Sequence, residues 1–116
     1  MAEDRSDLLQ GTLELLVLKA LSLESMHGWG IGHRIDQWSK DVLRVQQGSL
    51  YPALQRMLRK GWVKSEWRHT ENNRRARYYL LTAEGRRQLA HETESWQRTS
   101  GAVNAVLRTR TAEGGA

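Results

Sequence analysis

The sequence predicts a mainly α-helical chain that carries one small β-hairpin and ends in a long helix. Three observations lead to this fold class. Apolar residues recur at spacings of three and four in several segments, as on the buried face of a helix. Two β-prone runs, at residues 62–68 and 76–81, flank a polar stretch, which is typical of a hairpin. The segment after them is long enough for a helix of about 39 Å, at about 1.5 Å per residue.

The length and composition fit one compact domain. The chain has 116 residues, 39% of them apolar, so it can bury a modest core. Cysteine is absent, which excludes disulfides, thiolate zinc sites and cysteine nucleophiles. No apolar run approaches the roughly 18 residues of a membrane-spanning helix, and residues 1–7 are polar rather than signal-like. We therefore expect a cytoplasmic protein that does not contact a membrane.

The first helix is expected to begin near Asp7, which resembles a capping residue paired with Gln10. An apolar stripe follows at helical spacing and predicts a buried face made of Leu9, Leu13, Leu16, Val17, Ala20 and Leu21. The other leucines of this helix, Leu8, Leu15 and Leu18, fall outside the stripe. A helix that is apolar on more than one face needs two neighbours, so we expect Leu8 and Leu15 to contact a partner subunit.

A second, shorter helix is predicted after a turn at residues 26–28, with Ile31, Ile35 and Trp38 at positions i, i+4 and i+7. Its glycine-rich start, GWGIG, could also suggest a phosphate-binding loop. No strand precedes it and no Lys-Ser or Lys-Thr pair follows, so close helix packing is the better explanation for the glycines. Residues 41–45 are expected to form a short strand.

The third helix is expected to begin at Ser49 as N-cap, with Pro52 in its first turn, and to end at Gly61. Its core stripe consists of Leu50, Leu54, Met57 and Leu58. Polar and cationic residues are predicted on the opposite side, namely Ser49, Pro52, Arg56, Arg59 and Lys60.

Positive charge is concentrated in the middle of the chain. Residues 34–87 contain 13 Lys or Arg and 5 Asp or Glu, whereas the flanking segments are acidic or neutral. Arg74, Arg75 and Arg77 lie at the tip of the predicted hairpin. A central basic block is suited to face nucleic acid, because counterion release drives much of that affinity. The simpler interpretation is a solvated basic surface, and charge alone does not separate the two.

The last helix is predicted at residues 83–108, with Thr82 as N-cap and Glu84 near its positive end. Apolar residues repeat along it as a sparse coiled-coil seam: Leu89, Trp96, Val103, Val106 and Leu107. Such a helix needs a partner, and its twin in a two-fold homodimer is the most economical one. Polar residues and Gly101 interrupt the seam, so the register stays open. Residues 109–116 are expected to form a disordered tail.

Three short helices followed by a β-ribbon is the order of a winged helix-turn-helix, which we therefore assign to residues 1–82, with residues 83–108 as the dimerisation helix. In this fold the third helix enters the major groove of double-stranded DNA and the ribbon, or wing, contacts the backbone or the minor groove. The DNA-binding candidates are Ser49, Tyr51, Gln55, Arg56, Arg59, Lys60, Arg74, Arg75 and Arg77.

Two stretches, GSLYPALQRMLRKGW and RRARYYLLTAEGRRQL, resemble the PadR family of transcriptional regulators. The likeness extends over about residues 8–107 and includes the His27-Gly28 pair. The short C-terminus is similar to the subfamily with a single dimerisation helix. The stretches DLLQGTLELLVLKAL and ENNRRARYY are similar to members encoded beside permease genes. The resemblance implies a homodimeric repressor of a pseudo-palindromic operator.

The resemblance also implies a small-molecule effector. Family members often release DNA when a ligand binds, and some short members accept planar aromatic compounds between their terminal helices. Trp96 is the candidate residue for such a site, although it could equally be a tryptophan that only packs the dimer. The namesake phenolic-acid sensors have a longer C-terminal region, so their effector cannot be transferred. Trp29 stands where the family usually has tyrosine.

Competing function classes fit the residues less well. The four histidines are never spaced i, i+4, no serine lies in a nucleophile-elbow pattern, and no carboxylates obviously converge, so we expect no metal site, no cofactor and no enzyme activity. Winged helices also serve as protein-docking or RNA-binding modules, because a fold does not determine function. The cationic third helix favours the DNA-binding regulator, since a docking module more often presents an apolar surface there.

Overall fold

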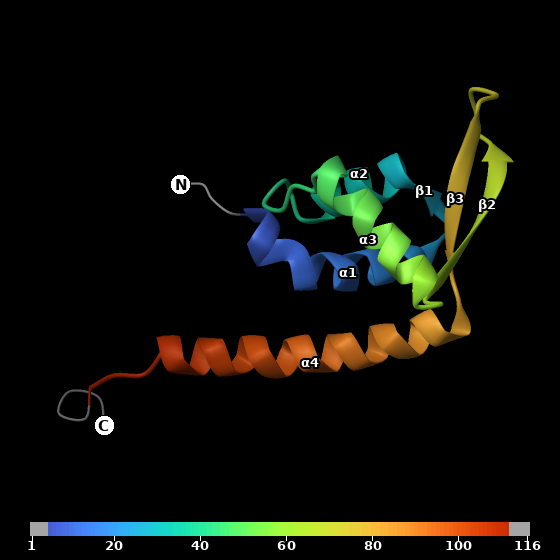
Figure 1. Cartoon of the computed structure of the whole chain (residues 1–116). Coiled ribbons are helices and arrows are strands. Elements are labelled where there is room, and N and C mark those ends of the chain that lie inside the picture. Colours follow the sequence, from blue (N-terminus) through green and yellow to red (C-terminus); the bar gives the residue numbers. More distant parts are fainter. Residues whose placement is uncertain (1–4, 112–116) are drawn as a thin grey trace.

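The computed structural model describes the backbone of residues 5–111 and the side chains of residues 11–111. Its elements follow one another as predicted for a mainly α-helical chain with a small β-sheet (Figure 1). They are α1 (Arg5–Leu23), β1 (Met26–His27), α2 (Gly28–Trp38), α3 (Gln47–Arg59), β2 (Val63–His69), β3 (Arg75–Leu81) and α4 (Ala83–Leu107). The fold class predicted from the sequence is confirmed.

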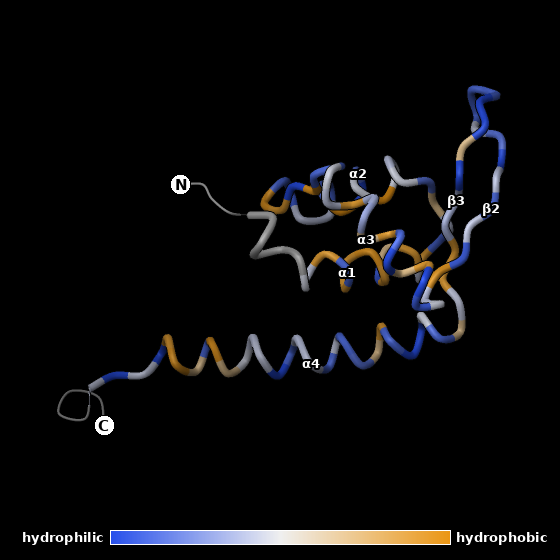
Figure 2. Tube along the Cα trace, in the orientation of Figure 1, coloured by the Kyte–Doolittle hydropathy of each residue, from blue (hydrophilic) through white to orange (hydrophobic). Residues whose placement is uncertain are grey.

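The core lies where α1, α2 and α3 meet the base of the sheet. Figure 2 shows the apolar segments of these helices facing one another. Leu13, Val17 and Leu21 are buried there, as the stripe on α1 predicted. Leu18 was predicted outside that stripe, which is wrong: it is fully buried, because α1 packs against α2, α3, α4 and β3 rather than on one side alone. The helix begins at Arg5, so Asp7 lies inside it and the predicted capping pair is wrong. The side chain of Leu8 is outside the described part of the chain.

The sheet has three strands in the order β1-β3-β2, all antiparallel. The β2–β3 hairpin was predicted, and its register pairs Val63 with Leu81 and His69 with Arg75. The strand β1 was missed, because residues 26–28 were assigned to a turn. Two residues are too few to show strand alternation, and they are extended here because they bond to the free edge of β3, Met26 opposite Tyr79.

The predicted strand at residues 41–45 is wrong, because this segment is the loop between α2 and α3. Lys40 and Asp41 have positive φ angles of 54° and 65°, which turn the chain out of α2. Side chains of α2 and its C-cap accept hydrogen bonds from the backbone N–H groups of the loop that follows. The Asp36 carboxylate accepts from the Val45 N–H at 2.9 Å, and the Ser39 hydroxyl oxygen accepts from the Leu43 N–H at 3.1 Å.

The recognition helix α3 begins at Gln47, two residues before the predicted N-cap. The N–H groups of Ser49 and Leu50 both donate to the Gln46 carbonyl oxygen, so Ser49 is inside the first turn and cannot cap it. Pro52 consequently lies in the second turn rather than the first. The C-terminal prediction is confirmed, since Gly61 has a φ of 78° and donates to the Leu58 carbonyl oxygen in a Schellman motif.

Thr82 caps α4 as predicted. Its hydroxyl oxygen accepts from the Gly85 N–H at 3.0 Å, and the hydroxyl donates to the Gly61 carbonyl oxygen at 2.7 Å. A Cβ added to Gly85 would lie 2.1 Å from the Trp62 carbonyl oxygen, so only glycine allows α4 to start this close to β2. Leu89 packs against the core of its own chain. Beyond it α4 continues past α1 (Figure 1), which accounts for the elongated extents of 66 × 32 × 21 Å.

Candidate nucleic-acid interface

The outward face of α3 differs slightly from the predicted one. Leu50, Ala53, Leu54 and Met57 are buried, which leaves one continuous exposed stripe opposite them. That stripe consists of Gly48, Tyr51, Pro52, Gln55 and Arg59. Ser49 and Arg56 are only half-exposed and lie on its flank. Gln55 and Arg59 are one helical turn apart on the same face, so both can reach the same groove of a duplex.

Arg56 is held by the first helix. Its Nε donates to the Glu14 carboxylate at 2.8 Å, and the side chains retain 31% (Arg56) and 19% (Glu14) of their exposure. Because the two residues are 42 positions apart in sequence, no local pattern pointed to Glu14. The ion pair joins α3 to α1 and directs the Arg56 guanidinium away from the exposed stripe, so its first role is to orient the recognition helix.

The other two cations of α3 lie near its C-terminal end. Lys60 is exposed and its Nζ lies 4.6 Å above the Trp62 ring centroid, in a cation–π contact. Arg59 makes no ion pair or hydrogen bond with any residue of the described segment 11–111. Its guanidinium is therefore available to an external anion.

The wing projects away from the helices (Figure 1). Its tip is closed by two backbone hydrogen bonds, from Thr70 N–H to the Arg74 carbonyl oxygen at 2.7 Å and from Asn73 N–H to the Thr70 carbonyl oxygen at 2.9 Å. Asn73 has a φ of 61°, a conformation that asparagine tolerates better than most residues. The adjacent asparagines that predicted the hairpin thus supply its turn, and Arg74, Arg75 and Arg77 are all exposed on it.

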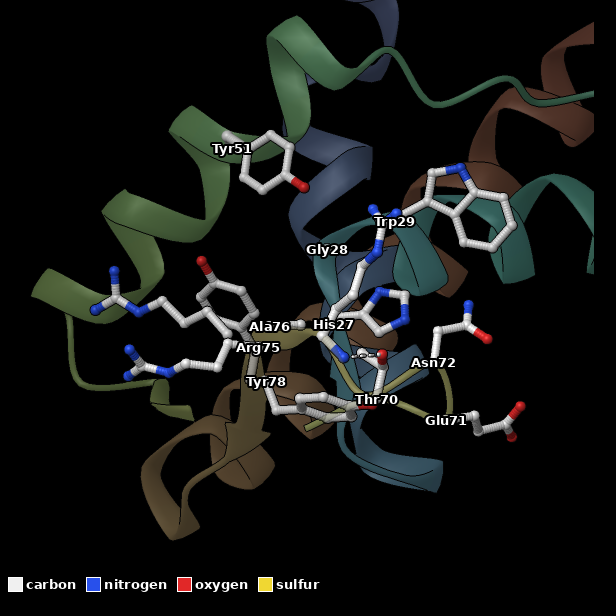
Figure 3. A pocket seen from close by; sticks show the side chains of 13 residues that line it. His27, Gly28, Trp29, Tyr51, Thr70, Glu71, Asn72, Arg75, Ala76 and Tyr78 are labelled. Atoms are coloured by element: carbon white, nitrogen blue, oxygen red, sulfur yellow. Dashed lines mark hydrogen bonds between the residues drawn. The ribbon is translucent and has the colours of Figure 1, made fainter. Parts of the chain in front are cut away.

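A groove of about 760 Å³ separates the wing from the N-terminal ends of α2 and α3 (Figure 3). The ring of Tyr51 lies directly over Gly28, where an added Cβ would be 2.6 Å from the tyrosine oxygen. Close packing therefore explains the glycine, as the sequence suggested. The groove is lined from both sides by aromatic, cationic and polar groups: His27, Gly28, Trp29, Tyr51, Thr70, Glu71, Asn72, Arg74, Arg75, Ala76, Arg77, Tyr78 and Tyr79.

At the base of the wing, Arg77 faces the helices rather than the tip. Its Nε donates to the Ser65 hydroxyl at 2.9 Å across the hairpin. Burial raises the pKa of the neighbouring Tyr79 phenol above its ordinary value of 10.0; the positive charge of Arg77 opposes this shift and Tyr51 adds to it. Tyr51, Arg77 and Tyr79 all line the groove, so α3 and the wing face each other across it.

Sequence reasoning did not find the residues that fix the edge of this groove at α2. The His27 Nδ1 accepts from the Gly30 N–H at 3.1 Å and so caps α2. The Trp29 ring stacks on His33 with centroids 4.7 Å apart, and the indole remains 60% exposed. The His-Gly pair was noted only for its family likeness, although a histidine before a helix start could have suggested a cap.

The distal half of α4 forms a second surface. Trp96, Val103, Val106 and Leu107 are all strongly exposed, with Trp96 at 49% and Leu107 at 76%. Leu15 on α1 is half-buried. Exposed apolar side chains grouped on one half of a helix are typical of a protein–protein contact. Leu89, which was also predicted for the dimer seam, is partly buried against the core of its own chain.

Two further searches of the molecule bear on function. No cluster of three or more His, Asp or Glu side chains that could hold a metal ion occurs within the described residues. None of the helices in the described range has the length and apolarity needed to cross a membrane.

Comparisons with known proteins agree with this geometry. Residues 17–91 match the family described as transcriptional regulator PadR-like. A PadR-like transcriptional regulator from Bacillus cereus is 28% identical, with a TM-score of 0.78 over 90% of this chain and 100% of that one. A transcriptional regulator from Clostridium thermocellum is 26% identical, with a TM-score of 0.78 over 86% and 97%.

A sequence relative has a different overall length. The chain is 40% identical over 90 residues to an uncharacterised 37.1 kDa protein in a transposon of Streptomyces fradiae, and the alignment covers 78% of this chain but 24% of that protein. The family resemblance and the winged-helix fold that the sequence predicted are confirmed by these comparisons.

Proposed function

Because the chain belongs to the PadR-like family of transcriptional regulators, which bind DNA and are not enzymes, we propose that it is a homodimeric repressor of a pseudo-palindromic operator. The observation that carries the proposal is the continuous surface formed by the exposed stripe of α3 and the wing, with the groove between them. We propose the cytoplasm as the compartment in which it acts.

On this proposal α3 reads the major groove. Gln55 and Arg59 are the base-reading residues, because they are exposed on the same face and Arg59 has no partner within residues 11–111. Tyr51 lines the groove toward the wing. Among the remaining members of the set, Arg75 contacts DNA from the wing. The others contact phosphates or hold the helix in place: Ser49, Arg56, Lys60, Arg74 and Arg77.

The distal half of α4 is the proposed dimer contact, together with Leu8 and Leu15 of α1. Trp96, Val103, Val106 and Leu107 would be covered by the partner subunit, and a two-fold axis would place two copies of α3 on successive major grooves. Replacing both Val103 and Leu107 with Glu should yield monomers in sedimentation velocity. The matched control is Val42→Glu, since Val42 is 77% exposed on the α2–α3 loop. A dimer that survives the double substitution would show that α4 is not the contact.

We also propose that a planar aromatic compound binds at Trp96 and releases the operator. The half-exposed indole on the dimer surface supports this, and the alternative is that Trp96 only packs the dimer. Titration of the complex with a panel of planar aromatic compounds should quench Trp96 fluorescence and release DNA, and Trp96→Phe should weaken both. If no compound changes either signal, Trp96 is a packing residue.

The DNA-binding surface is tested by footprinting the region upstream of the native gene and by titrating binding against salt. Protection of an inverted repeat, with steep salt dependence, is expected for wild type. Arg59→Ala should reduce the protection, whereas Arg86→Ala, which removes a similarly exposed charge from α4, should not. Binding that ignores the DNA sequence would favour the second candidate, a protein-docking or RNA-binding winged helix. Deletion of the gene should raise transcription from the footprinted promoter; lower transcription would indicate an activator.

A further inference from the structure

A tryptophan on the wing lies among the arginines and belongs to none of the predicted sites. Trp67 is on β2, opposite Arg77 in the β2–β3 register, and it is 58% exposed. The guanidinium carbon of Arg75 lies 4.8 Å from its ring centroid. Tryptophan and arginine are both enriched at binding hot spots. We therefore consider the stacked pair as a candidate contact for a ligand.

The three wing arginines differ in how firmly they are held. Arg77 is bonded to Ser65 at the base of the wing. The side chain of Arg74, at the tip, has no partner among residues 11–111. Arg75 alone is stacked on an aromatic ring, which restricts its rotamers while leaving every N–H of its guanidinium free to donate.

The position of the pair along the wing determines what it can reach. Tyr79 is the residue of β3 buried against the helices. Arg75 is four residues closer to the tip, a distance of about 13 Å at about 3.3 Å per residue. Arg75, Trp67 and Tyr79 lie on the same face of the hairpin, because the side chains of alternate residues share a face and Trp67 is paired with Arg77. The pair therefore extends beyond the edge of α3 on the side that faces the groove.

We propose that Trp67 is the positioning residue of the wing: stacked against Arg75, it holds this guanidinium so that it reads the minor groove next to the major groove occupied by α3. The inference rests on the proposed function. It adds the residues that distinguish one DNA sequence from another at base pairs that α3 does not contact. A minor groove about 6 Å wide admits one extended guanidinium, and a narrow A·T-rich groove attracts it through its enhanced negative potential. Trp67 holds Arg75 extended and offers its exposed ring to the sugars of the groove wall.

The test uses base pairs that alter one groove and not the other. Hydroxyl-radical footprints of wild type and Arg75→Ala first locate the operator positions whose minor-groove protection depends on Arg75. At those positions A·T pairs are replaced by inosine·cytosine, which keeps the A·T-like minor groove, by G·C, and by diaminopurine·T. The last two place an amino group in the minor groove.

Wild type should bind the A·T and inosine·cytosine operators within about twofold of each other, and bind the two amino-bearing operators at least tenfold more weakly. In Trp67→Ala this tenfold difference should shrink below threefold, and Trp67→Phe should retain part of it. The matched control Trp38→Ala removes an indole that is 45% exposed on α2, outside the wing, so it should keep the full difference.

Equal affinity of wild type for all four operators would overturn the inference, and so would a full tenfold difference in Trp67→Ala. Failure of the proposed function would give a different set of results. In that case wild type would show no sequence-dependent footprint, and Arg59→Ala would change nothing. Circular dichroism melts of each variant verify that the wing is folded.

Discussion

Substitution of two arginines about one turn apart on α3 should affect different properties, fold stability for one and DNA binding for the other. Arg56 is paired with Glu14 at 2.8 Å in a partly buried site, whereas Arg59 has no partner within the described residues. Arg56→Ala should therefore reduce fold stability, because it leaves the Glu14 carboxylate unpaired at 19% exposure. Arg59→Ala should leave stability unchanged within about 0.5 kcal/mol and weaken DNA binding instead.

The size of the Arg56 effect follows from the hydrogen bond that is lost. A hydrogen bond to a charged group contributes about 1.5–3 kcal/mol. With roughly 4 °C per kcal/mol for a domain of this size, the melting temperature should fall by about 6–12 °C. A double-mutant cycle with Glu14→Gln and Arg56→Met should return a coupling energy of about 0.5–3 kcal/mol.

The assays are thermal unfolding at fixed protein concentration, since a dimer makes the melting temperature depend on concentration, and a salt titration of operator binding. Arg59→Ala should reduce the log–log salt slope by about 0.9 if it neutralises one phosphate. The reasoning is refuted if Arg56→Ala melts like wild type but loses operator binding. That pattern would mean that Arg56 leaves Glu14 and contacts DNA directly.

Three further predictions concern positions that hold the site together. Gly85→Ala should destabilise the protein by about 3 kcal/mol or more, because the new Cβ would lie 2.1 Å from the Trp62 carbonyl oxygen. Its control, Gly101→Ala, has nothing within 4 Å of the new Cβ and should be neutral or stabilising by up to about 1 kcal/mol in the same urea unfolding assay. His27→Ala should cost about 1 kcal/mol by removing the α2 cap, and His27→Asn should restore most of it in the same assay. The raised pKa of Tyr79 means that the folded state retains the phenol proton more tightly than the unfolded state, so this contribution is complete below pH 10.0 and is lost as the pH rises further; between about pH 9 and pH 11 wild type should lose more stability than Tyr79→Phe, and equal losses would remove the assignment.

Local patterns were sufficient for the helices and the hairpin. The Thr82 cap and the Gly61 helix end depend on residues within a few positions of one another, and both were predicted correctly. The α1 stripe was right for Leu13, Val17, Ala20 and Leu21 but left out Leu18, which is fully buried. The strand expected at residues 41–45 was wrong because only a local residue pattern supported it. The chain instead leaves α2 through two left-handed residues, and side chains of α2 and its C-cap stabilise the loop. Ser49 was chosen as N-cap from residue type alone, and the true start depends on the extended backbone of Gln46.

The sequence alone determined the order of the elements, the family and the concentration of cations on α3 and the wing, because periodicity, turn chemistry and charge are local properties. Only the tertiary structure decided which of those cations are available to DNA. Glu14 engages Arg56 across 42 residues, Trp67 orders Arg75 across the hairpin, and the core covers Leu89. Each of these contacts joins segments that are distant along the chain, and the packing of the helices against the sheet is what brings them together.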